Sequence, residues 1–251
     1  TSTPCKRVRG ARRSSSRACT ALMVRLERAF ETKSGVPVGF WRSVGHSHNA
    51  FFSECFIDEL AFEARQDPVA FRLALLKESP RHAAVLKLAA EKAGWPGFGE
   101  ARALPTGVAR GVALHESFGS IVAQVVELSM VGGKPKLRRV VCAADVGTVV
   151  NPMIVAQQME GGVIFGLSAA LYGRIDIEGG VVRQTNFPNY PIVTMAESPH
   201  IETHLVPSTR PPSGVGEPGV PPIAPAPQIS SVIAKALRST PGSPGRRCPR
   251  S

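Results

Sequence analysis

Apolar residues recur at helical spacing in the first part of the chain. Over residues 51–64 they fall three and four positions apart, which predicts an amphipathic helix with one buried face. Asp67 and Pro68 are typical of a helix start, because the carboxylate can cap the first turn and proline lacks only an N–H that would be unpaired there. The sequence therefore predicts a second helix after Asp67 and a third over residues 82–93, which ends at Gly94.

Beyond a linker rich in glycine and proline at residues 95–106, the pattern becomes that of β-strands. Segments rich in valine and isoleucine predict strands at residues 107–115, 120–130, 136–144, 174–177, 181–185 and 201–206. Residues 132–133, both glycine, predict a hairpin turn, and residues 151–172 return to helical spacing. Residues 207–227 are dense in proline and glycine and follow neither pattern, and a last helix is expected near residues 229–237. This order of elements predicts an α+β fold with mixed sheets and packed helices.

The composition is that of a globular protein whose excess charge lies at its two ends. The 251 residues are 43% hydrophobic, and 30 Lys/Arg against 19 Asp/Glu give a formal net charge of +11. Nine basic and two acidic residues give residues 1–34 a charge of +7, and five basic residues give residues 235–251 a charge of +5, which leaves −1 between them. We therefore expect basic, disordered tails at residues 1–34 and 239–251. Between them we expect a helical segment at residues 35–94 and an α+β domain at residues 107–238.

Cysteine usage favours a reducing compartment. The five cysteines are odd in number and match no zinc-binding spacing, and only Cys55 and Cys142 lie between the basic tails. We therefore expect a cytoplasmic rather than a periplasmic protein, although the natural N-terminus is expected upstream of Thr1, so the compartment stays open. The sequence has no run of about 18 uncharged apolar residues, so a membrane span is not expected.

The segment VGFWRSVGHSHN at residues 38–49 follows neither a helical nor a strand pattern. It combines an aromatic ring, a guanidinium, two imidazoles and two glycines, which is typical of a loop whose backbone approaches a ligand. His46 and His48 have no third metal-ligating side chain near them in sequence, so a metal site is not predicted here.

The predicted helix at residues 151–172 contains glycines in its interior. Glycine weakens a helix there by about 1 kcal/mol relative to alanine, so Gly162 and Gly166 predict close packing against another element. Gln158 and Glu160 are then candidate polar contacts at the end of the helix that faces a ligand.

A single carboxylate, Glu217, lies between Gly216 and Pro218 in the sequence SGVGEPGVPP. Proline fixes its own backbone and restricts the residue before it to extended geometry. Two interpretations are open: a rigid structural turn, or a general base whose position and pKa are set by a tight pocket.

Several segments together resemble a known family. They read GFWRSVGHSHNAFFSECFIDELAFEARQDPVAFRLALL, ADVGTVVNP, QQMEGGVIFGLSAALYG, NFPNYPI and GVGEPGVPPIAPA. In this order they resemble the molybdopterin-binding large subunit of the xanthine dehydrogenase/aldehyde oxidase family, most nearly the branch formed by isoquinoline 1-oxidoreductase beta subunits. The resemblance covers about residues 35–226, so residues 107–238 are expected to form the C-terminal molybdopterin-binding part of such a large subunit.

The resemblance implies roles for individual residues. Glu217 matches the catalytic glutamate, which takes a proton from a hydroxide on molybdenum. Gln158 matches a glutamine that hydrogen-bonds the pterin, and Trp41 and Arg42 match an aromatic–arginine pair in a loop beneath the metal, so that this loop faces the cofactor. In xanthine dehydrogenases the loop usually reads FRGFGGPQ, whereas here it reads WRSVGHSHN, which puts substrate contacts carried over from the purine enzymes in doubt.

The resemblance also implies a reaction and its partners. The family hydroxylates N-heterocycles or aldehydes with water as the oxygen source, using a molybdopterin cofactor, here expected as the cytosine dinucleotide form. Electrons leave through 2Fe–2S clusters on an iron–sulfur small subunit. No protein residue is expected to ligate the metal, and no nucleic-acid partner is expected.

Two family loops are missing from the chain. Neither a GGxEMGQG-type pterin loop nor a Gly-Gly-Phe-Gly-type loop is present. The chain is therefore expected to be the C-terminal third of a longer subunit, to need its missing N-terminal part, and to be inactive alone. The alternative is a non-catalytic interaction module with basic tails, a degenerate relic of the family.

Overall fold

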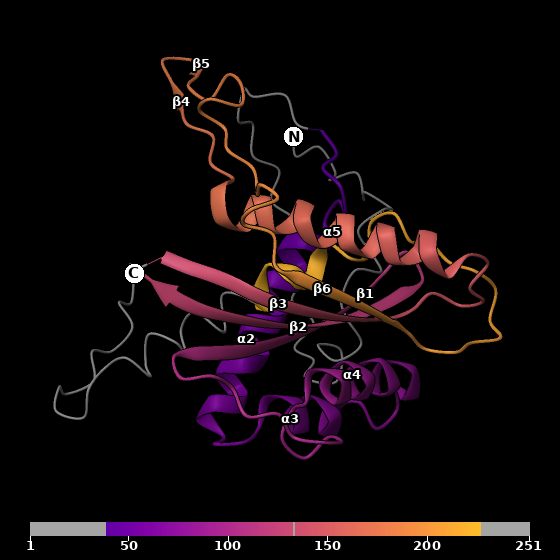
Figure 1. Ribbon diagram of the computed structural model, residues 1–251. Coiled ribbons are helices and arrows are strands. Elements are labelled where there is room, and N and C mark those ends of the chain that lie inside the picture. Colours follow the sequence, from indigo (N-terminus) through magenta and orange to yellow (C-terminus); the bar gives the residue numbers. More distant parts are fainter. Residues whose placement is uncertain (1–38, 133, 227–251) are drawn as a thin grey trace, which may run out of the picture.

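The computed structural model describes residues 39–132 and 134–226 (Figure 1). The predicted tails and the predicted helix near residues 229–237 lie outside these residues. The elements are α2 (His46–Glu63), α3 (Pro68–Leu75), α4 (Pro80–Ala93), β1 (Val108–Ser117), β2 (Ser120–Val131), β3 (Lys134–Asp145), α5 (Pro152–Tyr172), β4 (Ile177–Glu178), β5 (Val181–Val182), β6 (His200–Leu205) and the 3₁₀ turn η1 (Pro221–Ile223).

Four strands form one mixed sheet in the order β1-β2-β3-β6. β1, β2 and β3 are antiparallel neighbours, whereas β6 pairs with β3 in parallel after the chain has crossed over through α5. β2 is buried along nearly its whole length because helices cover both faces of the sheet, which explains why its apolar residues run on without alternation. The α+β class with a mixed sheet is therefore confirmed.

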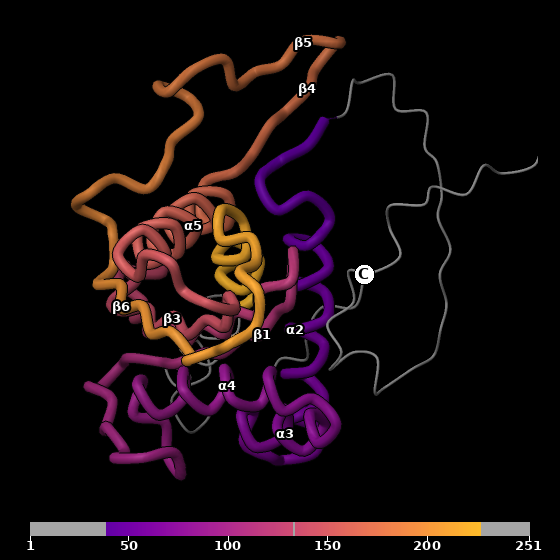
Figure 2. Tube along the Cα trace, turned by 90° about the vertical axis from the view of Figure 1, so that its right-hand side faces the viewer, coloured from indigo at the N-terminus to yellow at the C-terminus, as the bar shows by residue number. Residues whose placement is uncertain are grey.

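The helices lie in layers around this sheet. α3 and α4 cover one face and α5 covers the other, while α2 runs past the β1 edge from one side to the other (Figures 1 and 2). Ile57 of α2, Leu86 of α4 and Leu114 of β1 belong to one buried cluster, so the helical segment and the sheet share a core. Val163 and Leu167 of α5 pack in a second cluster on the opposite face.

The helix ends follow local sequence rules. The Asp67 carboxylate accepts hydrogen bonds from the backbone N–H groups of Val69 and Ala70, so it caps α3 as predicted. The Asn151 side chain caps α5 in the same way. Gly94 ends α4 at a φ of 65°, a left-handed conformation that glycine adopts without strain.

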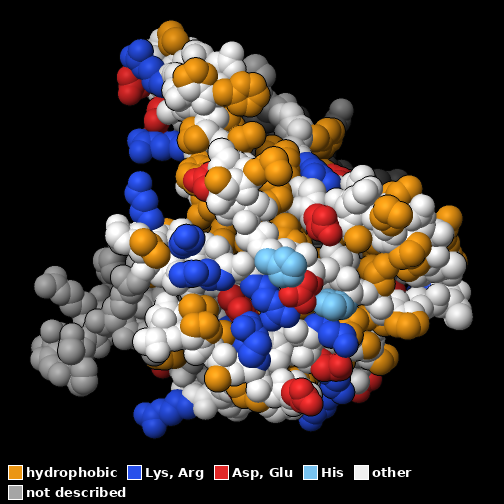
Figure 3. Space-filling view, in the orientation of Figure 1, with side chains coloured by type: hydrophobic (Ala, Val, Ile, Leu, Met, Phe, Trp, Pro, Cys, Tyr) orange, Lys and Arg blue, Asp and Glu red, His pale blue; other side chains and the backbone are white. Residues whose placement is uncertain are grey.

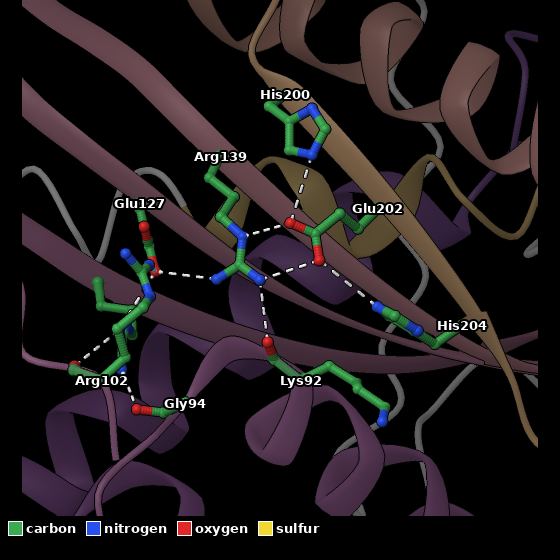
Figure 4. A network of polar contacts seen from close by, with 9 residues as sticks. Lys92, Gly94, Arg102, Glu127, Arg139, His200, Glu202 and His204 are labelled. Atoms are coloured by element: carbon green, nitrogen blue, oxygen red, sulfur yellow. Dashed lines mark hydrogen bonds and ion pairs between the residues drawn. The ribbon is translucent and has the colours of Figure 1, made fainter. Parts of the chain in front are cut away.

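An ion-pair network fixes the C-terminal end of α4 to the sheet (Figure 4). Arg139 on β3 holds the Glu202 carboxylate of β6 through two contacts of 2.6 and 2.9 Å, and it donates to the backbone oxygen of Lys92 at 2.9 Å. The buried carboxylate of Glu127 on β2 lies between Arg139, Arg110 and Arg102. Four strands and one helix are thereby tied together by charge, in addition to their apolar packing.

Two local predictions need correction. Residues 38–49 were expected to be loop throughout, but α2 begins at His46, where the side chain is held against the sheet by His115. The second hairpin is shorter than predicted, because only residues 177–178 and 181–182 pair at its exposed tip.

Within the described part of the chain, α5 is long and apolar enough to cross a membrane by length and composition. In this fold it packs on β6 and η1 and supplies buried residues to the core.

Candidate functional site

The loop that carries Glu217 lies directly against α5. A Cβ atom on Gly162 would lie 3.2 Å from the backbone of Gly219, and one on Gly166 would lie 2.2 Å from a methyl carbon of Ile223. No side chain fits at Gly166 without displacement, so the glycines of α5 allow residues 216–223 to approach the helix. The packing predicted for these two glycines is confirmed.

Arg42 joins this loop to α5. Its Nε donates to the backbone oxygen of Gly216 at 2.7 Å, and its Nη2 donates to Oε1 of Gln158 at 3.4 Å. The guanidinium also lies over the Phe165 ring, 5.4 Å from its centre, and Trp41 packs on the same ring at 4.7 Å. The Arg42 side chain therefore contacts two segments, at Gln158 and at Gly216, that each lie more than 100 residues away from it in sequence.

Glu217 is oriented by the segment that follows Arg42. The backbone N–H of Ser43 donates to Glu217 Oε1 at 2.9 Å, and the Glu217 carbonyl accepts from the N–H of Val220. Ser43 and Val44 have φ values of 84° and 52°, which are unusual for residues with a side chain and most unusual for a β-branched one. This strained turn aims the Ser43 N–H at the carboxylate, and such strain is typical of functional sites.

The structure thus brings together the four residues to which the family resemblance gave roles, Trp41, Arg42, Gln158 and Glu217. Gln158 is exposed on α5, and Glu217 is half-buried. The roles of the four residues remain predictions, because their positions alone do not show what they bind.

His46 was considered in the sequence only as a metal ligand, and its partner in the structure, His115, was not singled out. His46 Nδ1 and His115 Nε2 are 3.0 Å apart, and His115 is buried in β1. Burial lowers the pKa of His46, while the carboxylates of Glu217 and Glu116 act in the opposite direction. Burial, assisted by the neighbouring His46, lowers the pKa of His115 to about 3. A polar HES sequence within an otherwise apolar strand was the available signal for His115.

The tip of the β1–β2 hairpin also touches the Glu217 loop. Ser120 Oγ lies 2.6 Å from Ser213 Oγ and donates to the backbone oxygen of Gly214 at 2.7 Å. The tip residue Phe118 is 41% exposed and packs on His46 with ring centres 4.9 Å apart. Phe118 therefore contacts His46 and lies close to Gly214 in the segment that leads to Glu217.

A cavity of about 730 Å³ lies between α2 and α5. It is lined by mostly apolar side chains, among them Trp41, Phe52, Leu171 and Tyr190. Glu217 does not line it, so the cavity adjoins the site through Trp41 and is not the space in which the carboxylate would act.

The charge of Arg42 suits an anionic ligand. Its hydrogen-bond partners within residues 39–132 and 134–226 are neutral oxygens, so its positive charge is not neutralised by a carboxylate. Gln158 also presents its amide N–H groups on the exposed face of α5. An anionic group with hydrogen-bond acceptors, as a molybdopterin phosphate has, fits these two residues. In the same described ranges, no cluster of three or more His, Cys, Asp or Glu side chains is arranged to hold a metal ion directly.

Comparisons with known proteins identify relatives of this chain. Residues 102–199 match the family model for the molybdopterin cofactor-binding domain. The chain is 38% identical over 224 residues to the beta subunit of isoquinoline 1-oxidoreductase from Brevundimonas diminuta, a match that covers 86% of this chain and 28% of the relative. It is 33% identical over 199 residues to a nicotinate dehydrogenase subunit from Pseudomonas putida, covering 72% of this chain and 16% of the relative.

A solved structure shows the same fold at low sequence identity. The aldehyde oxidoreductase from Desulfovibrio desulfuricans is similar with a TM-score of 0.53 and 14% identity, over 77% of this chain and 38% of that one. The chain therefore spans between about a sixth and two fifths of the length of these relatives.

Proposed function

Because this chain belongs to the xanthine dehydrogenase/aldehyde oxidase family of molybdopterin-binding oxidoreductases, we propose that it supplies the catalytic base and part of the cofactor site of a molybdenum hydroxylase. The observation that carries this proposal is the junction at Arg42. One guanidinium holds the backbone of Gly216 and the side chain of Gln158, and the next residue along the chain, Ser43, orients Glu217. A merely rigid turn would not require Arg42 to join the Glu217 loop to α5 while the next residue binds the carboxylate.

We infer that Glu217 acts as the general base, and its hydrogen bonds support this role. The Ser43 N–H occupies Oε1, which leaves Oε2 as the oxygen that can accept a proton. The backbone is constrained on both sides of Glu217, because Arg42 holds the Gly216 carbonyl and Pro218 follows. When bound, the molybdenum–pterin group would supply the oxidising centre that receives the substrate's electrons.

Arg42 and Gln158 would hold the cofactor from one side. A guanidinium provides charge-assisted hydrogen bonds to an anionic group, and the amide of Gln158 provides directional ones. The Phe165 ring lies against the Arg42 guanidinium, and Trp41 packs on the same ring at an angle of 33°. We assign the pterin to these residues, in its cytosine dinucleotide form, and 2Fe–2S clusters to an iron–sulfur small subunit that accepts the electrons.

The substrate class that we propose is an N-heterocycle hydroxylated with oxygen from water. The names of two relatives, isoquinoline 1-oxidoreductase and nicotinate dehydrogenase, both contain such a heterocycle. Aldehydes are the competing class, and a chimeric enzyme separates the two.

The test is a chimeric large subunit. Residues 39–226 replace the matching segment of the Brevundimonas diminuta protein, which is produced with its small subunit in a host that makes the molybdenum cofactor. We expect molybdenum by metal analysis and oxygen-18 from labelled water in a hydroxylated heterocycle. Absence of molybdenum from a folded chimera would refute the proposal, whereas oxidation of aldehydes alone would correct the substrate class. The 251-residue chain by itself should hold little molybdenum, because the few hydrogen bonds of Arg42 and Gln158 cannot offset the cost of immobilising a large anion.

The same purified chain tests the alternative of a basic-tailed interaction module. Basic and acidic side chains lie intermixed on the face seen in Figure 3, which is unlike the single basic patch of a nucleic-acid-binding surface. If the module interpretation were correct, RNA or DNA binding would be measurable and would weaken steeply with salt.

A further inference from the structure

Two histidines meet at the start of α2, next to the turn whose Ser43 N–H holds Glu217. His46 Nδ1 and His115 Nε2 are 3.0 Å apart, so one of these nitrogens carries a proton and the other accepts it. His115 is 1% exposed, and burial lowers its pKa to about 3, so at neutral pH its ring is uncharged and has one N–H. The direction of this hydrogen bond therefore fixes which nitrogen of each ring is protonated.

The other nitrogen of the His115 ring decides that direction. His115 Nδ1 is buried and has no hydrogen-bond partner among the described residues. If it carried the proton, a donor would be buried without an acceptor, which proteins rarely leave. The form protonated on Nε2 is also the more stable neutral form of free histidine. His115 therefore donates from Nε2 to His46 Nδ1, and His46, when neutral, carries its own proton on Nε2.

The surroundings of His46 keep its ring uncharged. Burial lowers the pKa of His46 below 6.5, and the positive charge that His48 can carry acts in the same direction. The carboxylates of Glu217 and Glu116 raise this pKa but do not outweigh burial. Glu116 is itself 3.0 Å from Nε2 of His82 on α4. At neutral pH the His46 ring is therefore a neutral hydrogen-bond donor.

We infer that His46 is a positioning residue for Glu217: His115 holds its imidazole as a neutral N–H donor that stays uncharged while the carboxylate takes and gives up its proton. This inference rests on the proposed function. The backbone supports it, because the His46 N–H donates to the Ser43 carbonyl at 3.0 Å, and the Ser43 N–H donates to Glu217 Oε1 at 2.9 Å. A charged imidazole would instead attract the ionised carboxylate and make it a weaker base.

The first measurement is the protonation state of His46 in the 251-residue chain. Nitrogen-15 NMR distinguishes the two ring nitrogens, and His46→Gln identifies their signals by removing them. We expect a proton on Nε2, none on Nδ1, and a ring that is less than half charged at pH 6.5. A neutral ring with its proton on Nδ1, or a ring that is more than half charged at pH 6.5, would overturn the inference.

A matched pair of variants at His115 tests whether its N–H is the cause. His115→Gln keeps an N–H that can reach His46 Nδ1, whereas His115→Phe keeps the ring volume and removes the donor. His46 should become charged at a higher pH in His115→Phe only, because Nδ1 is then free to take a proton. His200→Gln, which removes a side chain that is 73% exposed at the opposite edge of the sheet, should leave the titration of His46 unchanged. Equal titration of His46 in the two His115 variants would show that the histidine pair is packing alone.

The chimera links this behaviour to catalysis and distinguishes the inference from the proposed function. Between pH 7.5 and 5.5, turnover in His115→Phe should fall up to about tenfold more than in wild type, because an ordinary histidine with a pKa of about 6.5 is mostly charged at the lower pH. His115→Gln should follow wild type. If the chimera holds no molybdenum but NMR finds the neutral donor, the proposed function fails and the assignment of His46 stands. If molybdenum is retained and the pH profiles of the two variants coincide, the inference alone fails.

Discussion

Acid should unfold this protein partly through one buried imidazole. His115 is 1% exposed, in contact with His46, and burial lowers its pKa to about 3. In the unfolded chain the same side chain has a pKa of about 6.5. Between these two values the unfolded state binds one proton more than the folded state, so the free energy of unfolding decreases as the pH falls.

The size of this loss of stability follows from the difference between the pKa of His115 in the folded and the unfolded chain. Each pH unit below about 6.5 removes up to about 1.4 kcal/mol. The loss should therefore reach roughly 2–3 kcal/mol at pH 4.5 and about 4–5 kcal/mol near pH 3. Since a domain is stabilised by only about 5–15 kcal/mol in total, His115 alone would account for a large share of acid unfolding.

Urea unfolding between pH 7 and pH 4.5 measures this acid-dependent loss in the free energy of unfolding. Wild type is compared with His115→Gln, which cannot be protonated, and with His48→Gln, which removes an exposed imidazole. Carboxylates that titrate in this range affect all three proteins alike. The difference in pH dependence between wild type and His115→Gln therefore isolates the contribution of His115. We expect a flatter pH dependence in His115→Gln only. If His115→Gln loses stability with acid as steeply as wild type, the buried imidazole is not the cause and the reasoning is refuted.

Three further predictions concern the site and its support. In the chimera, Glu217→Gln should lower turnover ~10²–10⁴-fold, because the amide cannot accept the proton. Its molybdenum content should not change, since the Gln side chain can still accept the hydrogen bond of the Ser43 N–H. Turnover equal to that of the wild type would show that Glu217 is only a turn residue. Gly166→Ala should destabilise the chain by about 1–3 kcal/mol in urea unfolding, whereas Gly161→Ala, with open space around it, should stabilise it by up to about 1 kcal/mol. Arg72→Met should cost about 3–5 kcal/mol, because it leaves a buried carboxylate unpaired; a loss below about 1 kcal/mol would contradict this.

Much of the fold could be predicted from local patterns. The helix ends at Asp67 and Gly94 depend on the capping residue itself, and the strands follow their valine and isoleucine content. The parallel pairing of β6 with β3 could not be predicted, because nothing in the two segments specifies a partner across a long connection. It depends on the completed packing of α5.

The site was predictable only in part. Glu217, with glycine before it and proline after it, stands out by its constrained sequence, and Trp41, Arg42 and Gln158 stand out through the family resemblance. Ser43 does not, since a backbone N–H carries no sequence signal. The pairing of His46 with His115 could not be predicted either, because 69 residues separate them and His115 alone resembles an ordinary polar residue.

The Arg42–Gly216 hydrogen bond has a consequence for how the protein is made. Its two residues are 174 positions apart, whereas the β1–β2–β3 meander needs only neighbouring segments. Contacts between distant segments form slowly, because the intervening chain must be ordered first. At a synthesis rate of roughly 5–20 residues per second, Arg42 leaves the ribosome on the order of ten to thirty seconds before Gly216. The carboxylate of Glu217 can therefore reach the Ser43 N–H only after the segments that form α2 to β6 have been synthesised.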